Sequence, residues 1–261
     1  MDLGLKGKTA LITGASRGIG AGIARELARE GANVCLVARN REALDRMAAE
    51  LIEGGAKNVF VHSGDLRDGA ACEAAVAEAV RHLGRLDILV NNAGATKGGN
   101  FFKLSDADWD DGFALKMEGY VRVSRAAWPH LKQTKGAVIN IVGISARTPR
   151  ASLTIGGAVN AALLNFSKAL AELGRNDGVR VNTLSPGHIL TDRLAKRFKE
   201  VAQARSITEG EAEAEMLATL GISRFGRPEE IGWLTAYLAS EKAGYIQGAE
   251  INIDGGVTRG I

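Results

Sequence analysis

A glycine-rich turn near the start of the chain has the residue types and spacing of a phosphate-binding site. It follows an apolar run, leads directly into a helical pattern, and reads Thr13-Gly14-Ala15-Ser16-Arg17-Gly18-Ile19-Gly20. Glycines permit a tight turn and a close approach of the backbone to a pyrophosphate, while the start of the helix supplies amide donors. The turn therefore predicts a dinucleotide site with contacts from Gly14, Ser16, Arg17, Gly18, Ile19 and Gly20.

The charges beside this turn favour NADP(H) over NAD(H). NAD-binding turns usually carry an acid about 20 residues beyond the glycines, where it bonds the ribose 2′-hydroxyl. Here the second apolar run ends in Val37-Ala38-Arg39-Asn40, without an acid, and Arg17 lies inside the turn. Two guanidinium groups suit a 2′-phosphate dianion, so we expect Arg17 and Arg39 to bind it. The alternative is that both are ordinary surface arginines.

Short apolar runs alternate with amphipathic helical stretches along the whole chain. Their Val, Ile and Leu content without clean alternation is typical of parallel strands that are covered on both faces. The expected strands are Lys8–Thr13, Asn33–Ala38, Asn58–His62, Leu86–Val90, Gly136–Val142, Val179–Leu184 and Ala249–Ile253. The expected helices are Ile19–Glu30, Glu42–Glu53, Ala70–Leu83, Trp109–Leu131, Ile155–Leu173 and Glu229–Ala239.

This alternation predicts an α/β fold: a Rossmann-type, doubly wound, parallel seven-stranded sheet with helices on both faces. No linker divides the chain, so residues 1–261 are expected to form a single domain. Residues 192–220 are polar and helical in pattern, and we expect them to cap the carboxyl edge of the sheet as a substrate lid.

Several motifs in order along the chain resemble the short-chain dehydrogenase/reductase family. Three residues separate the first two glycines of the turn, as in that family. Asn91-Asn92-Ala93-Gly94 resembles its NNAG segment, and the run from Pro186 to Thr191 resembles its P-G-x-x-x-T segment. Arg227–Ile231 and Gly248–Gly256 match its closing segments. The resemblance implies further cofactor contacts from Asp65 and Leu66 at the adenine, and from Asn92, Ala93, Gly94, Pro186, Gly187, Ile189 and Thr191.

This sequence lacks the residues that perform this family's chemistry at the positions where the family has them. The family uses a Ser, a Tyr four residues before a Lys, and an Asn on the preceding long helix. Alignment on Phe166–Ala171 puts Gly156 at the Tyr position, Asn160 at the Lys position, Gly143 at the Ser position and Lys116 at the Asn position. The family's Tyr is the acid/base, and its pKa near 10 must be lowered by the Lys to work at neutral pH.

No shift of the alignment restores the tyrosine, because none lies between Tyr120 and Tyr237. Ser145 is a candidate for the polarising hydroxyl, although it can equally cap a turn. Lys116 is a candidate donor to a substrate oxygen, unless its charge lies at the surface. His188 is a candidate general acid or else an ordinary loop histidine.

Arg147 and Arg150 are expected near the mouth of the substrate cleft. They are candidates to hold a carboxylate or phosphate of the substrate. Glycines at 143 and 156 remove bulk where a substrate carbonyl would be clamped. The pocket is therefore either larger than usual or filled by another side chain or subunit.

Composition excludes several function classes. A net charge of +3 is too small to indicate a nucleic-acid partner, and two cysteines are no disulfide framework. No signal peptide, membrane-spanning run or set of metal ligands is predicted, so we expect a cytoplasmic protein. The resemblance implies a homodimer or homotetramer, with a heteromer containing an active homologue as an alternative. Small residues on the second long helix, among them Gly157 and Ala161, would allow close packing between or within chains.

Three functions fit these observations. The first is an NADP(H)-dependent oxidoreductase that acts on a carbonyl or hydroxyl compound with non-standard or impaired catalysis. The second is a catalytically inactive, cofactor-binding subunit, a pseudoenzyme that acts as a sensor or as a partner of an active homologue. The third is a lyase or hydrolase that works without nicotinamide, and the intact cofactor motifs disfavour it.

Overall fold

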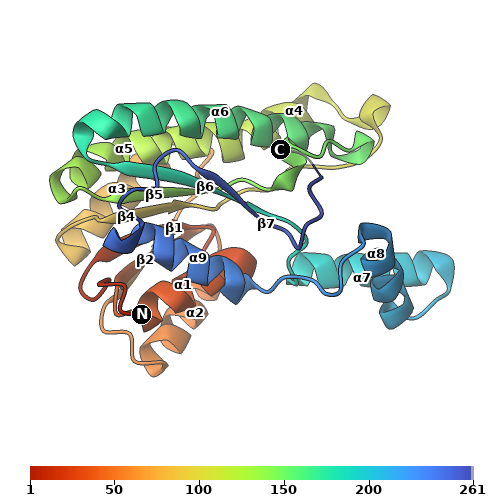
Figure 1. Cartoon of the computed structure of the whole chain (residues 1–261), viewed down its shortest axis with the longest axis horizontal. Coiled ribbons are helices and arrows are strands. Elements are labelled where there is room, and N and C mark those ends of the chain that lie inside the picture. Colours follow the sequence, from red (N-terminus) through yellow and green to blue (C-terminus); the bar gives the residue numbers. More distant parts are fainter. Residues whose placement is uncertain (260–261) are drawn as a thin grey trace.

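The computed structural model describes residues 1–259, which contain one sheet of seven parallel strands in the order β3-β2-β1-β4-β5-β6-β7 (Figure 1). The order reverses between β1 and β4, and ligands of such sheets bind at the carboxyl ends of the strands at that point. The strands are β1 (Thr9–Thr13), β2 (Asn33–Ala38), β3 (Val59–Ser63), β4 (Ile88–Asn91), β5 (Ala137–Ile141), β6 (Arg180–Pro186) and β7 (Glu250–Ile253).

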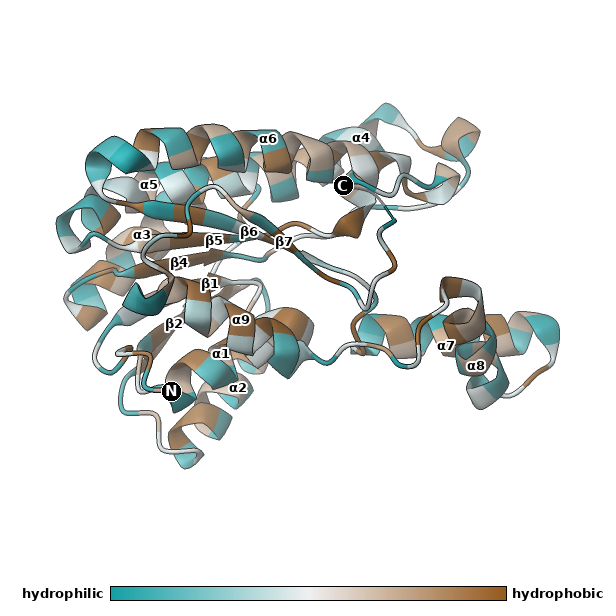
Figure 2. Cartoon of the chain, viewed as in Figure 1, coloured by the Kyte–Doolittle hydropathy of each residue, from teal (hydrophilic) through white to brown (hydrophobic). Residues whose placement is uncertain are grey.

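Helices cover both faces of the sheet. One face carries α1 (Gly18–Arg29), α2 (Arg41–Glu53) and α9 (Pro228–Ala239), and the other carries α3 (Gly69–Leu83), α5 (Gly119–Thr134) and α6 (Thr154–Asp177). Side chains of β1 alternate between the two cores: Ile12 packs on the α1 side and Leu11 on the opposite side. Figure 2 shows the strands as an apolar layer between helices whose outer faces are hydrophilic.

The predicted fold class is confirmed, and every predicted strand lies within two residues of an observed one. The largest differences, of two residues, are at the start of β4 and at the end of β6, which continues through Pro186 rather than ending at Leu184. Proline is tolerated there because it is the last residue of the strand. Helix α6 runs to Asp177, beyond the predicted end at Leu173, because Gly178 supplies the left-handed cap with φ +74°.

The predicted helix over Trp109–Leu131 is helical throughout, but a π turn interrupts its α-helical winding. The segment consists of α4 (Asp106–Gly112), a π-helical turn (Phe113–Glu118) and α5, which follow one another without a break. Helix α4 begins earlier than predicted because Ser105 and Asp108 form a capping box. A π turn inserts an extra residue into the helical winding and is frequent at functional sites. This one contains Lys116 and changes the direction in which that side chain leaves the helix.

The predicted lid, residues 192–220, is two helices rather than one segment. Helix α7 (Asp192–Arg205) ends at Ser206 in the left-handed region, φ +53°, and α8 (Glu209–Leu220) begins with a capping box at Thr208. The two project from the body as an arm (Figure 1), with a small core of their own around Leu194, Phe198 and Phe225.

Five short 3₁₀ or π segments complete the described chain: Phe101–Lys103, Phe113–Glu118, Ile144–Ala146, Ala151–Leu153 and Glu241–Ala243. Within residues 1–259, none of the helices combines the length and hydropathy needed to cross a bilayer.

Candidate active site

The glycine-rich turn forms a cradle that side chains would fill. Gly14 and Gly18 have φ of +67° and +57°, which strains any other residue. A Cβ on Gly20 would lie 2.2 Å from the carbonyl oxygen of Gly14. Helix α1 starts without a side-chain cap and without an acid in its first turn, so its amide groups are free to bind an anion. These features fit a pyrophosphate.

The end of β4 holds this turn in place. Asn92 Nδ2 donates to the carbonyl oxygens of Thr13 and Gly14, at 3.0 and 3.3 Å. The hydroxyl of Thr13 accepts the backbone N–H groups of Asn92 and Ala93, at 2.9 and 3.0 Å. The structure therefore brings together two motifs that are 79 residues apart and gives Asn92 a positioning role.

The P-G-x-x-x-T segment lies against the same turn. A Cβ on Gly18 would contact Thr191 Cγ2 at 3.4 Å, and Gly187 packs so closely on Asp254 that a Cβ would lie 2.6 Å from it. Ile189 pairs with Gly226, which fixes the segment after α8 beside it. A hollow of about 350 Å³ between the turn and this segment is lined by residues that include Ser16, Arg17, Gly18 and Thr191.

The adenine end of the site offers two arginines. Arg39 has only a 4.0 Å ion pair with Asp65, whose carboxylate is instead bonded by Arg67 at 3.1 and 3.2 Å. Arg17 forms no ion pair within residues 1–259. Leu66 is buried beside Asp65. The charge of Arg17 and most of that of Arg39 are therefore available to a 2′-phosphate.

The positions that the alignment gives to the family's Ser and Tyr, Gly143 and Gly156, carry no reactive side chain, and other side chains pack closely against both. Gly143 has φ +115°, and a Cβ on Gly156 would lie 2.9 Å from the hydroxyl of Thr96. No tyrosine of the chain reaches this place. Tyr120 is buried and donates to the Ile141 carbonyl, Tyr237 packs in the core beneath α9, and Tyr245 is fully exposed before β7.

The side chain of Lys116 extends from the π turn toward the place of Gly143 and Gly156. Its Nζ donates to the Val142 carbonyl oxygen and to Asn160 Oδ1, both at 2.6 Å. Its stem passes over Gly94, where a Cβ would lie 2.8 Å from Lys116 Cδ, so only glycine leaves room for it. Burial of the amine, and to a smaller extent the charge of Arg193, lower the pKa of Lys116 to about 7.

Asn160 continues this contact into a chain of polar groups. Its Nδ2 donates to Ser145 Oγ at 2.7 Å and lies 3.5 Å from the Gly143 carbonyl oxygen. Lys116, Asn160 and Ser145 thus form one hydrogen-bonded row across the carboxyl end of β5. Two of the three candidates for missing groups, Ser145 and Lys116, meet through Asn160, a connection that the sequence did not predict.

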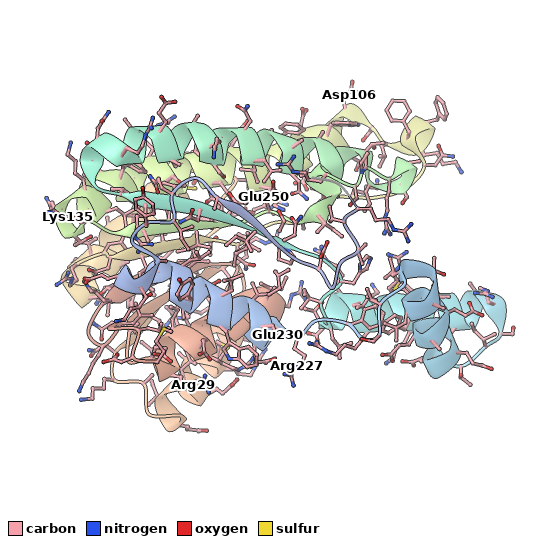
Figure 3. The ribbon with its side chains drawn as sticks, viewed as in Figure 1. Arg29, Asp106, Lys135, Arg227, Glu230 and Glu250 are labelled. Carbon is pink, nitrogen blue, oxygen red and sulfur yellow. The ribbon has the colours of Figure 1, made fainter. Side chains whose placement is uncertain are left out.

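The remaining candidates, Arg147, Arg150 and His188, are not part of this hydrogen-bonded row. Arg147 is bound to Glu250 of β7 at 2.6 and 2.8 Å, and Figure 3 shows Glu250 on the side of the sheet that faces α6. The charge of Arg147 is therefore neutralised, whereas Arg150 forms no ion pair among the described residues. His188 has a buried Nδ1 without a hydrogen-bond partner in residues 1–259. Burial, and then the charges of Arg150 and Arg197, lower the pKa of His188.

Sequence reasoning missed Arg193 and Arg197. The signal was present, since they lie four residues apart at the start of α7, directly after Thr191. They resembled an ordinary charged helix face because acids and lysines are interspersed with them.

Comparisons with known proteins agree with this geometry. The sequence pattern of the family described as Enoyl-(Acyl carrier protein) reductase matches residues 14–258. Oxidoreductase UcpA of Salmonella typhimurium is 37% identical over 259 residues, 97% of this chain and 95% of that protein. The solved L-sorbose reductase of Gluconobacter frateurii, complexed with NADPH and L-sorbose, is 35% identical, with a TM-score of 0.96 over 100% of both chains. A short-chain dehydrogenase/reductase from Serratia marcescens is 33% identical, with a TM-score of 0.85 over 97% of this chain and 99% of the other.

Proposed function

The chain belongs to the short-chain dehydrogenase/reductase family, and on that premise we propose that it is an NADP(H)-dependent oxidoreductase in which Lys116 handles the proton. The substrate is a carbonyl compound or the corresponding alcohol. The observation that carries the proposal is the position of Lys116 Nζ, between the end of β5 and Asn160, beside the two glycines that replace the family's Ser and Tyr.

Several residues support the cofactor assignment. The turn from Gly14 to Gly20 and the start of α1 suit the pyrophosphate, and Arg17 and Arg39 suit the 2′-phosphate. The solved L-sorbose reductase, 35% identical, holds NADPH. When bound, the nicotinamide supplies or accepts a hydride at the substrate carbon.

The protein then needs to move only a proton. An ammonium group has three donors. Two of those on Lys116 are occupied by Val142 and Asn160, which leaves the third for the substrate oxygen. In carbonyl reduction the substrate carbon gains the hydride, the oxygen takes this proton, and Lys116 is left as a neutral amine. In alcohol oxidation the neutral amine takes the hydroxyl proton.

A lysine suits this work only if both forms exist near neutral pH. An ordinary lysine has a pKa near 10.4 and would stay protonated, but burial lowers the pKa of Lys116 to about 7. A group that titrates near the working pH is the most effective acid/base. Asn160 holds the amine in place and is itself held by Ser145.

The test is consumption of NADPH with a panel of aldehydes and ketones, by the native protein and by Lys116→Met. We expect turnover by the native protein and a loss of about 10²–10⁴-fold in the variant, with NADPH affinity unchanged. Binding of NADPH without consumption by the native protein would instead indicate a cofactor-binding subunit. Equal rates for both proteins would contradict the role of Lys116.

A further inference from the structure

Positive side chains gather around the mouth of the cleft without acidic partners. Many arginines of residues 1–259 are paired, among them Arg25 with Glu50, Arg67 with Asp111 and Arg224 with Glu230. Arg150, Arg193 and Arg197 are exposed and form no such pair with the described residues. Unpaired guanidinium groups are typical of sites that bind a carboxylate or phosphate.

The three arginines come from two segments, the start of α7 and the loop between β5 and α6. Arg193 and Arg197 lie one turn apart on α7 and so project from the same side of that helix. Helix α7 starts at Thr191, which contacts the glycine-rich turn at Gly18. Arg150 lies between β5 and α6, seven residues after Gly143.

Their charges act on the groups inside the cleft. Burial is the main cause that lowers the pKa of Lys116, and Arg193 contributes to it. Burial likewise lowers the pKa of His188, and Arg150 and Arg197 add to that effect. Positive potential from both sides therefore reaches the place where the substrate would lie.

The acids nearby are already engaged. Asp254 faces His188, but its carboxylate accepts the backbone N–H groups of Gly256 and Thr258, at 2.9 and 2.8 Å. On α7, Glu200 pairs with Lys196. Asp192 lines the hollow beside the glycine-rich turn rather than the substrate side.

His188 adds a second, independent observation. Its Nδ1 is buried and has no hydrogen-bond partner among the described residues. Buried polar atoms are rarely left unpaired in proteins, and an exception calls for an explanation such as a ligand.

We propose that Arg150, Arg193 and Arg197 bind a carboxylate or phosphate group carried by the substrate, with His188 as a further hydrogen-bond partner. This proposal rests on the proposed function, because it defines the substrate class of that site as an anionic carbonyl compound. Helix α7 then carries part of the substrate specificity of the enzyme.

The experiment measures binding rather than turnover. The protein is saturated with NADP⁺, which occupies Arg17 and Arg39, and is titrated by calorimetry with two matched pairs of probes. One pair is 4-oxopentanoate and its neutral amide, and the other is dihydroxyacetone phosphate and dihydroxyacetone. At least one charged probe should bind about 10-fold or more tightly than its neutral partner, which is about 1.4 kcal/mol. The pair that shows the preference identifies the carboxylate or the phosphate.

The variants assign that preference to the arginines. Arg150→Gln/Arg197→Gln should abolish it, while Lys199→Gln should keep it. Lys199 loses the same charge from the same helix but lies about 200° around it from Arg197. Equal binding of charged and neutral probes, binding of none of the four, or a preference that survives in the double variant would overturn the proposal.

The proposed function fails on a different result, namely no NADPH consumption with any carbonyl compound. If NADP⁺ itself does not bind, the same titrations are made on Arg17→Gln/Arg39→Gln, which removes the competing phosphate site.

Discussion

Lys116 and Asn160 face each other with Nζ and Oδ1 2.6 Å apart, at the two positions where the sequence alignment predicts the family's Asn and Lys. Where the family pattern has asparagine on the long helix, this chain has lysine, and where it has lysine on the next helix, this chain has asparagine. A lysine–asparagine pair therefore persists in the cleft, but its charge approaches from the π turn before α5 rather than from α6.

The pH dependence of the reaction should follow this amine. The pKa of Lys116 is lowered by burial to about 7, so the protonated form dominates below that pH and the neutral form above it. Carbonyl reduction uses the protonated form, and its rate should be constant below pH 7 and fall about tenfold per pH unit above it. Alcohol oxidation should show the opposite profile. The two pH profiles are measured as the single-turnover rates of NADPH oxidation and of NADP⁺ reduction across pH 5–10.

The variant Lys116→Arg is the control for that profile. A guanidinium stays protonated throughout this range, so any reduction that remains should lose its inflection near 7. An unchanged inflection in this variant would assign the titration to another group.

Exchanging the pair back tests whether the place of the charge matters. Lys116→Asn/Asn160→Lys keeps the composition and net charge of the protein. We expect NADPH to bind with similar affinity but turnover to fall by about 10²–10⁴-fold, because no acid then reaches the substrate oxygen. Calorimetry and steady-state rates measure the two effects separately. Undiminished turnover would mean that any lysine in the cleft suffices.

The preference for NADPH should depend on Arg17 and Arg39. Arg17→Gln/Arg39→Gln should weaken NADPH binding by about 10–100-fold, since each charge-assisted hydrogen bond contributes about 1.5–3 kcal/mol and part of this is lost to solvent. NADH binding should change by less than about threefold. Arg125→Gln, which removes an exposed charge from α5, is the matched control. Equal loss of both nucleotides would point to a general structural effect.

The close packing of the phosphate turn predicts a sharp contrast between two glycines. In Gly20→Ala the new methyl group would meet the Gly14 carbonyl at 2.2 Å and force the turn apart. We expect a loss of about 1–3 kcal/mol of unfolding free energy and of NADPH binding. Gly210→Ala, in α8, meets open space and should stabilise the protein slightly. Urea denaturation of both variants measures the difference.

The sequence predicts the sheet well because each parallel strand is a nearly continuous apolar run such as Leu86–Val90. It also predicts the tight glycine-rich turn, since Gly14 needs a positive φ and Gly20 has no room for a side chain. The π turn around Lys116 could not be predicted from the sequence. It inserts only one extra residue into a helix, so the apolar pattern of the segment still fits an α-helix. The pairing of Arg147 with Glu250, 103 residues away, was equally hidden, since only the fold brings β7 beside α6.

The role of Lys116 is tested most directly by its pKa, measured by ¹⁵N NMR of the lysine Nζ in the NADP⁺ complex and assigned with Lys116→Arg. We expect a titration near 7, set apart from the other lysines of the chain. A value near 10.4, the ordinary one for lysine, would contradict the role of Lys116 as the proton carrier.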